Sequence, residues 1–327
     1  MYLLLGLLVF LLLCGLGLFA YTLTWKRRAE RAVPPRGAFT RISTGRLHYL
    51  DVGKGPVIFL IHGLGGQMGN FDCGLIDNLA KDHRVIAIDR PGMGWSERPL
   101  TAPCSPADTA ALMFEIMDKL EVTAPLVVGH SLGGAIALNM AVQRPERMRG
   151  LALLAPLTLP AGRPAEIFDG LRMNSDLVRW LVSWTFAAPA AMRQSAAVLE
   201  QLYSPEEMPP NAPVQGGALL TLRPSHFYHT SRDYMSSGEG LEELSRKYAD
   251  LTVPVRLLYG TGDRILDPQI HGAKLVGRHP QIGLKLIEGG HMLPLTQPQR
   301  CAEFIRDASE KMRGSLTIRR ASPEVYR

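Results

Sequence analysis

The sequence predicts an α/β protein built on a largely parallel sheet with helices on both faces. Short apolar runs alternate with helical patterns along most of the 327 residues, an alternation typical of such a sheet. Three runs, at residues 57–61, 85–88 and 126–128, are continuous and rich in β-branched residues, as expected for strands buried on both faces. Hydrophobic residues make up 46% and charged residues 20%, which excludes a generally disordered chain.

The N-terminal segment is expected to be a membrane anchor. No charged side chain occurs before Lys26, and leucine dominates the segment. About 21 helical residues would extend roughly 31 Å, enough to cross a hydrocarbon core of about 30 Å. A cleaved signal peptide would need a basic residue before the apolar run and a good cleavage site. Leu18-Phe19-Ala20 is a poor one, so we predict that residues 1–25 are a retained single-pass anchor.

The net charge of +6 comes from the two ends of the chain. Residues 26–41 hold six Lys or Arg against one Glu, and residues 311–327 hold five against one. This distribution favours a nearby anionic membrane surface and gives no reason to expect a nucleic-acid partner. We predict a basic linker over 26–41 and a basic tail over 313–327, whose charge could equally serve solubility. Lys26-Arg27-Arg28 place the following domain on the cytoplasmic side by the positive-inside rule.

The predicted domain covers residues 42–312. An opening hairpin is expected at residue 42 and residues 47–52, followed by strands at 57–61, 85–88, 126–128, 151–154, 255–259 and 284–287. Ser105 is expected to cap a helix with an apolar stripe that includes Ile116, and the final helix is expected over 298–312. Between residues 157 and 251 helical patterns and prolines recur without an evident strand. This break predicts a helical lid inserted after the sixth strand.

The segment Gly129-His130-Ser131-Leu132-Gly133 fits the pattern G-x-S-x-G between a predicted strand and a predicted helix. Such spacing gives a sharp turn on which the serine stands exposed, because glycine lacks a Cβ. The N-terminus of the following helix then directs free N–H groups toward the serine. We therefore predict that Ser131 is a nucleophile; a purely structural turn is the alternative.

A serine hydroxyl needs an adjacent base, and that base needs an orienting acid. His291 is the candidate base, because it directly follows the last predicted strand, where a loop can return to the serine. Asp263 is the candidate acid, since it follows the preceding strand, which ends near Gly260. Asp267 is a nearby rival, interpreted as a helix N-cap before Pro268.

The other eight histidines are given different interpretations. Turns, strand ends on the far side of the sheet, or a surface helix account for six of them: His62, His130, His48, His83, His271 and His279. In the predicted lid, His226 and His229 are candidates for contact with substrate.

The tetrahedral intermediate of acyl transfer needs two backbone N–H donors. Leu132 supplies one as the residue after the nucleophile, and Leu64, in the loop His62-Gly63-Leu64-Gly65-Gly66, is predicted to supply the other. A phosphate cradle is the alternative for this loop, but the Lys-Ser/Thr ending of a P-loop is missing. The four cysteines show no close spacing, so neither a disulfide framework nor a zinc site is predicted. No organic cofactor is implied.

Together these motifs resemble the α/β-hydrolase fold superfamily over residues 42–312. The resemblance rests on His62-Gly63, the segment Asp89 to Ser96 (DRPGMGWS), the G-x-S-x-G, Gly262-Asp263 and Gly290-His291. It implies the order Ser, Asp, His for the triad and a structural role for the segment from Asp89. Dehalogenases and epoxide hydrolases of this superfamily use an aspartate nucleophile, and Ser131 argues against both. Single-pass monoacylglycerol-lipase-like members share the layout of an N-terminal anchor and a cytoplasmic domain.

The predicted lid carries an apolar stripe near helical spacing: Leu177, Trp180, Leu181, Trp184 and Phe186. Core packing is one interpretation of this stripe, and a membrane-facing or acyl-binding surface is the other.

The sequence thus predicts a membrane-anchored serine hydrolase that cleaves a lipophilic or amphiphilic carboxylic ester. The same triad could instead cleave a thioester, an amide or a carbon–carbon bond. A catalytically silent binding protein of the same fold is the third possibility.

Overall fold

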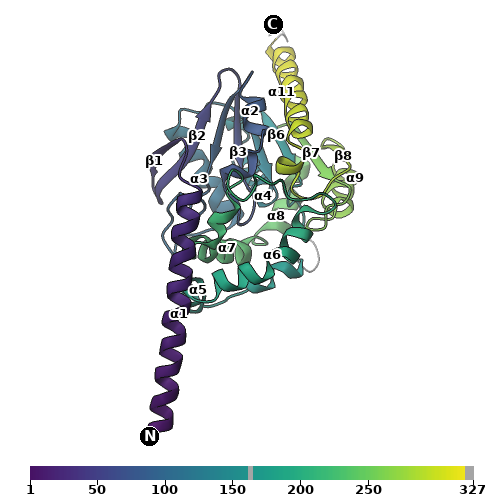
Figure 1. Ribbon diagram of the computed structural model, residues 1–327. Helices are drawn as coiled ribbons and strands as arrows, with labels where there is room; N and C mark the ends of the chain where they lie inside the picture. Colours follow the sequence, from purple (N-terminus) through teal and green to yellow (C-terminus); the bar gives the residue numbers. More distant parts are fainter. Residues whose placement is uncertain (161–164, 321–327) are drawn as a thin grey trace, which may run out of the picture.

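An eight-stranded sheet lies at the centre of the structure, a computed structural model that describes residues 1–160 and 165–320 (Figure 1). The strand order is β1-β2-β4-β3-β5-β6-β7-β8. The strands are β1 (Ala38–Ile42), β2 (Gly45–Val52), β3 (Val57–Ile61), β4 (Arg84–Ile88), β5 (Leu126–His130), β6 (Gly150–Leu154), β7 (Val255–Gly260) and β8 (Gly283–Ile287). The β1–β2 and β2–β4 pairs are antiparallel and the other pairs are parallel. The predicted α/β-hydrolase sheet is confirmed.

Helices cover both faces of the sheet, and each face has its own apolar core. Alternate residues of β3 show why: Phe59 and Ile61 pack into one core, whereas Ile58 and Leu60 pack into the other, as the two-residue period of a strand requires. On the first side lie α3 (Pro106–Lys119) and α4 (Leu132–Gln143). On the second lie α2 (Leu75–Leu79) and α11 (Pro298–Arg320).

The predicted cap of α3 is present. Ser105 Oγ accepts a hydrogen bond from the N–H of Asp108 at 3.1 Å, and the Asp108 carboxylate returns to the N–H of Ser105. This capping box satisfies two N–H groups that would otherwise lack partners. It fixes where the helix begins.

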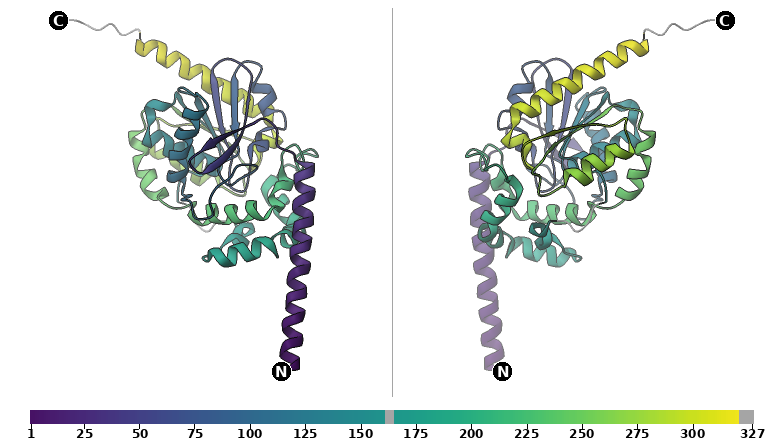
Figure 2. Two further views of the ribbon diagram at one scale, coloured as in Figure 1. Left: turned by 90° about the vertical axis from the view of Figure 1, so that its left-hand side faces the viewer. Right: turned by 90° about the vertical axis from the view of Figure 1, so that its right-hand side faces the viewer.

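Helices fill the insertion between β6 and β7, which we define as residues 157–251. The described residues of this segment form α5 (Asp176–Trp184), α6 (Ala187–Tyr203), α7 (Pro224–Ser236), α8 (Leu241–Arg246) and short 3₁₀ turns, with no strand among them. Its residues 161–164 lie outside the described part. Figures 1 and 2 show α5, α6 and α7 at the end of the domain from which α1 protrudes.

The N-terminal helix α1 (Tyr2–Ala32) is longer than predicted. It is long and apolar enough to cross a membrane, with a mean hydropathy of 2.8 over its most apolar window. The predicted linker over 26–41 is wrong in extent, because residues 26–32 continue α1 and β1 starts at Ala38. The helix continues because this part packs on the insertion: Ala29 is buried, and Glu30 forms an ion pair with Arg223 at 3.0 Å.

At the other end, α11 extends beyond its predicted end at residue 312 to Arg320. The predicted basic tail therefore begins as a helix, and its residues 321–327 lie outside the described part.

Candidate active site

Ser131 stands on a tight turn between β5 and α4. Its backbone has φ 54° and ψ −120°, a conformation that is strained for a residue with a side chain. The flanking glycines are needed for space: a Cβ at Gly129 would lie 2.3 Å from the carbonyl oxygen of Gly133, and one at Gly133 would lie 2.1 Å from that of Ile61. The strand, the turn and the helix thus pack too closely for any larger residue.

Asp263 and His291 come together at the carboxyl ends of β7 and β8. The Nδ1–H of His291 donates a hydrogen bond to Asp263 Oδ2 at 2.8 Å, and both side chains are buried. Burial alone would raise the pKa of Asp263, but His291 and the N–H groups of Ile265 and Leu266 outweigh it and lower that pKa. The aspartate is therefore ionised and fixes the histidine with Nε2 as the free ring nitrogen.

The turn that carries Ser131 contacts this pair through His130. Within the described residues, no hydrogen bond joins the Ser131 hydroxyl to His291. The neighbouring His130 does reach across, because its Nε2–H donates to the His291 carbonyl at 3.0 Å and the two rings lie 5.0 Å apart. Catalytic hydrogen bonds are commonly long before substrate binds and tighten in the complex.

The predicted oxyanion loop, residues 62–66, packs directly against Ser131. A Cβ at Gly63 would lie 2.8 Å from the Cβ of Ser131, so the loop and the serine are in contact. The N–H of Ser131 is itself used, since it donates to the carbonyl of Leu154 at 3.1 Å. Leu132 begins α4, where N–H groups have no partner within the helix. Leu132 therefore offers a backbone N–H next to Ser131, and the assignment of Leu64 as the second donor stays a prediction.

A buried ion-pair network, which was not predicted from the sequence, holds the loop of residues 62–66 in place. Arg90 donates to the carbonyls of His62 at 3.1 Å and Gly63 at 3.0 Å. Its guanidinium also pairs with Asp233 of α7 at 2.8 Å, and Arg98 pairs with the same carboxylate at 2.8 Å. The insertion is thereby tied to the loop that carries Leu64. The Arg-Pro-Gly motif that begins at Arg90 is the one sequence signal that could have indicated this residue. No sequence signal indicated Asp233.

Three histidines of or near the insertion are buried. His226 and His229 are buried and bonded inside the protein: His226 donates to the Gly65 carbonyl at 2.8 Å, and His229 faces Arg98 at 3.2 Å. Their predicted contact with substrate stays a prediction. His271 is buried, not on the surface, because Thr158 at the start of the insertion covers it and donates to its carbonyl at 2.8 Å.

The insertion also touches the loop that carries His291. Glu206 accepts a hydrogen bond from the N–H of Gly290 at 2.7 Å. A Cβ at Gly290 would lie 2.1 Å from the carbonyl oxygen of Ser204, so this approach requires glycine. The insertion therefore positions two of the loops that surround Ser131.

Two further predicted roles are confirmed. Asp89 is structural, because its buried carboxylate accepts from the N–H groups of Met68 and Trp95, each at 2.8 Å, and contacts the His48 ring at 2.7 Å. Asp267 caps the following helical turn, accepting from the N–H of Gln269 at 2.8 Å. Neither carboxylate competes with Asp263.

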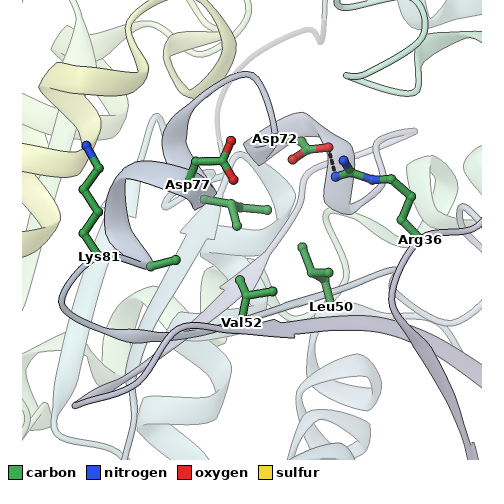
Figure 3. A pocket seen from close by; sticks show the side chains of 8 residues that line it. Arg36, Leu50, Val52, Asp72, Asp77 and Lys81 are labelled. Atoms are coloured by element: carbon green, nitrogen blue, oxygen red, sulfur yellow. Dashed lines mark hydrogen bonds and ion pairs between the residues drawn. The ribbon is translucent and has the colours of Figure 1, made fainter.

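Two surface hollows lie away from the candidate triad. The larger, of about 430 Å³, has an apolar floor that includes Leu50 and Val52 and a charged rim on which Arg36 pairs with Asp72 (Figure 3). The second, of about 240 Å³, lies next to it, between the end of α1 and β2. Neither is lined by a triad residue. Among the described residues, no cluster of His, Cys, Asp and Glu could hold a metal ion.

The buried histidines predict loss of stability in mild acid. Burial lowers the pKa of His226 to about 4, and that of His130 to about 3, whereas an unfolded histidine titrates near 6.5. Between these values the unfolded chain binds more protons, so stability is complete above about pH 6.5 and falls toward pH 4. At pH 5 we expect a loss of about 2 kcal/mol per such histidine, measured by urea unfolding of the full chain in detergent micelles.

The variant His226→Gln keeps an N–H donor for the Gly65 carbonyl. It should reduce the difference in the free energy of unfolding between pH 7.5 and pH 5 by about 2 kcal/mol. The same change at the partly exposed His279 should alter that difference less. An unchanged pH dependence in His226→Gln would contradict the interpretation.

Comparisons with known proteins agree with this fold. A family model of the alpha/beta hydrolase fold matches residues 56–298. The dihydrolipoyllysine-residue acetyltransferase component of an acetoin cleaving system from Cupriavidus necator is 37% identical over 120 residues, which are 36% of this chain and 32% of that protein. This chain therefore spans about a third of the length of that relative. A 2-hydroxy-6-oxo-6-phenylhexa-2,4-dienoate hydrolase from Burkholderia cepacia is 25% identical over 247 residues, covering 74% of this chain and 83% of the relative.

Among solved structures, a membrane phospholipase A described as a bacterial virulence factor superposes with a TM-score of 0.69 at 22% identity. The match covers 95% of this chain and 99% of that one, and at this identity it is a likeness of fold. The family model matches well over half of the sequence. This protein therefore belongs to the α/β-hydrolase family.

Proposed function

We propose that the protein is a membrane-anchored serine hydrolase that cleaves a lipophilic or amphiphilic carboxylic ester through an acyl-enzyme on Ser131. The observation that carries the proposal is the 2.8 Å hydrogen bond between His291 and Asp263, beside a serine held on a strained turn at φ 54°. A nucleophile, a base and an orienting acid at one sheet edge are the requirements for acyl transfer.

The reaction would run in two halves. Ser131 Oγ attacks the ester carbonyl while His291 Nε2 takes the hydroxyl proton, and the N–H groups of Leu64 and Leu132 stabilise the oxyanion. His291 then gives the proton to the leaving alcohol, and the acyl group stays on Ser131. In the second half, water attacks the acyl-enzyme with His291 as base, and the carboxylic acid leaves as the serine regains its proton. Asp263 stays ionised throughout and stabilises the histidinium.

The anchor supports an amphiphilic substrate. An uncleaved α1 would keep the catalytic domain at a bilayer, where esters with long acyl chains concentrate. The overall likeness to a membrane phospholipase A adds support for a lipid ester.

Lys26, Arg27 and Arg28 follow the apolar span, so we propose a cytoplasmic domain by the positive-inside rule. Protease treatment of inverted and right-side-out vesicles tests this orientation. Digestion of the domain in right-side-out vesicles would contradict it.

The test of function is covalent labelling followed by a substrate series. A fluorophosphonate probe should label the full-length protein in detergent micelles, and the label should be absent in Ser131→Ala. Turnover should then be measured on esters and glycerides of increasing acyl length, and we expect a maximum beyond the shortest chains. Labelling without turnover on any ester would contradict the ester assignment, and absence of labelling would favour a catalytically silent binding protein.

A second candidate is hydrolysis of a carbon–carbon bond. The relative from Burkholderia cepacia favours this candidate, because its name gives a 2-hydroxy-6-oxo-dienoate as the substrate. The match to that relative covers 74% of this chain. Comparing kcat/KM on a vinylogous diketone with that on the best ester separates the two. A larger value on the diketone would overturn the ester assignment while keeping the same triad. Thioesters and amides belong in the same comparison.

A further inference from the structure

Helix α5 has its apolar side chains on the outside. Leu177 is 66% exposed and Leu181 is 48% exposed, and Val178 and Trp180 are exposed beside them. The inner side of the same helix is polar: Arg179 and Ser183 are buried, and Arg179 donates to Ser231 of α7 at 2.9 Å. This inverts the usual amphipathic pattern of a helix on a water-soluble surface. The core-packing interpretation of the predicted stripe is therefore wrong for its exposed members.

Phe186, at the start of α6, extends the exposed set. We define the apolar face by its members: Leu177, Val178, Trp180, Leu181 and Phe186. Contiguous exposed apolar side chains of this kind mark a surface that contacts something apolar.

The other member of the predicted stripe fixes this face relative to α1. The Trp184 ring stacks on Phe19 of α1 with the ring centroids 5.3 Å apart. One turn further along α1, buried Thr22 donates to the carbonyl of Thr185 at 3.2 Å. Helix α5 is thus joined to α1 at the level of residues 19–22.

The end of the apolar part of α1 sets the depth of that junction in a membrane. No charged side chain occurs in α1 before Lys26, so the proposed span ends near Trp25. Residues 19–22, the level of α5, lie roughly 5–9 Å along the helix before that end, which puts them near the boundary between acyl chains and headgroups. Tyr21 and Trp25 lie at the same end of the span, with Arg28 over the Trp25 ring at 5.1 Å, an arrangement typical of the interfacial zone.

The shape of the molecule agrees with this depth. Figures 1 and 2 show α5 and α6 at the end of the domain nearest to the free half of α1, whereas the sheet and α11 lie beyond them. A bilayer crossed by α1 would meet the insertion before any other part of the domain.

We propose that the apolar face lies in the acyl–headgroup boundary of the bilayer that α1 spans, so that the insertion is a second membrane contact. The inference rests on the proposed anchoring and extends it to the insertion, which contacts Gly65 and Gly290 of the active-site loops. The bilayer is the occupant because this face adjoins α1 through Trp184 and Thr185, and α1 is the proposed membrane span. The lipid surface thereby reaches the segment that surrounds the candidate site.

Depth-dependent quenching tests the position directly. The full-length protein is reconstituted in phosphatidylcholine vesicles that carry bromine near the headgroup end of the acyl chains. Bromine should quench the wild-type fluorescence more strongly than that of Trp180→Phe, whereas Trp95→Phe, away from α5, should not reduce the quenching. Equal quenching in wild type and Trp180→Phe would overturn the proposal. Failure of the protein to float with vesicles would overturn the anchor as well.

A kinetic comparison tests the consequence for substrate. Leu181→Asp should lower turnover of a long-chain ester presented in the same vesicles by roughly tenfold, because a carboxylate replaces an apolar contact with lipid. Its turnover of a short water-soluble ester should stay unchanged. The control is Leu286→Asp in β8, where the leucine is 41% exposed and both activities should persist. An equal loss of long-chain turnover in Leu181→Asp and Leu286→Asp would overturn the proposal. If neither ester is a substrate, the quenching experiment still decides it.

Discussion

Replacing Ser131 by alanine should lower kcat/KM on the best ester by roughly 10⁴-fold or more while the protein stays folded. The change removes the Oγ that would form the acyl-enzyme, and it leaves the backbone and its packing in place. The measurement is steady-state turnover in detergent micelles, with urea unfolding on the same samples to confirm that stability is retained. Alanine keeps the Cβ, so the strain of the turn at φ 54° is retained and stability should change little.

The pattern across variants distinguishes a triad from a residue that merely lies nearby. His291→Ala should cost a similar factor, and the double variant should cost little more than either single change, because triad members act as a unit. Ser195→Ala, the same change at an exposed serine of α6, should leave turnover unaltered. Retained activity in Ser131→Ala would mean that another group is the nucleophile.

The fold was predictable because its signals are local. The strand Val57–Ile61 begins and ends where predicted, since a continuous β-branched run can be satisfied only by burial on both faces. The cap at Ser105 was equally local. The contact between Asp263 and His291 was predictable for a different reason: parallel strands end at a common edge, so loops after neighbouring strands meet there.

What could not be predicted depends on contacts between distant segments. Basic residues after an apolar span suggest a linker, yet residues 26–32 stay helical because Ala29 and Glu30 pack on the insertion. The buried position of His271 likewise depends on Thr158, which lies far from it in sequence. No local pattern specifies which side of an inserted helix will face the protein, and α5 presents its polar side inward.

Asp233→Asn should be the most destabilising conservative change in the insertion, with an expected loss of about 3–5 kcal/mol in the free energy of unfolding. The amide keeps the shape but removes the charge that balances Arg90 and Arg98, and all three side chains are buried. The guanidinium groups of Arg98 and Arg90 lower the pKa of Asp233 despite its burial, so the carboxylate is ionised in the folded state. Urea unfolding of the full chain in detergent micelles measures the loss.

A surface ion pair supplies the control for this change. Asp118 pairs with Arg147, and its side chain is 63% exposed, so Asp118→Asn should cost no more than about 1 kcal/mol. Asp233→Asn should also lower kcat more than KM in the fraction that stays folded, because Arg90 holds the carbonyls of His62 and Gly63 behind the Leu64 donor. A loss of stability no larger than that of Asp118→Asn would show that the two arginines find other partners. In that case the insertion would not be what holds the oxyanion loop in place.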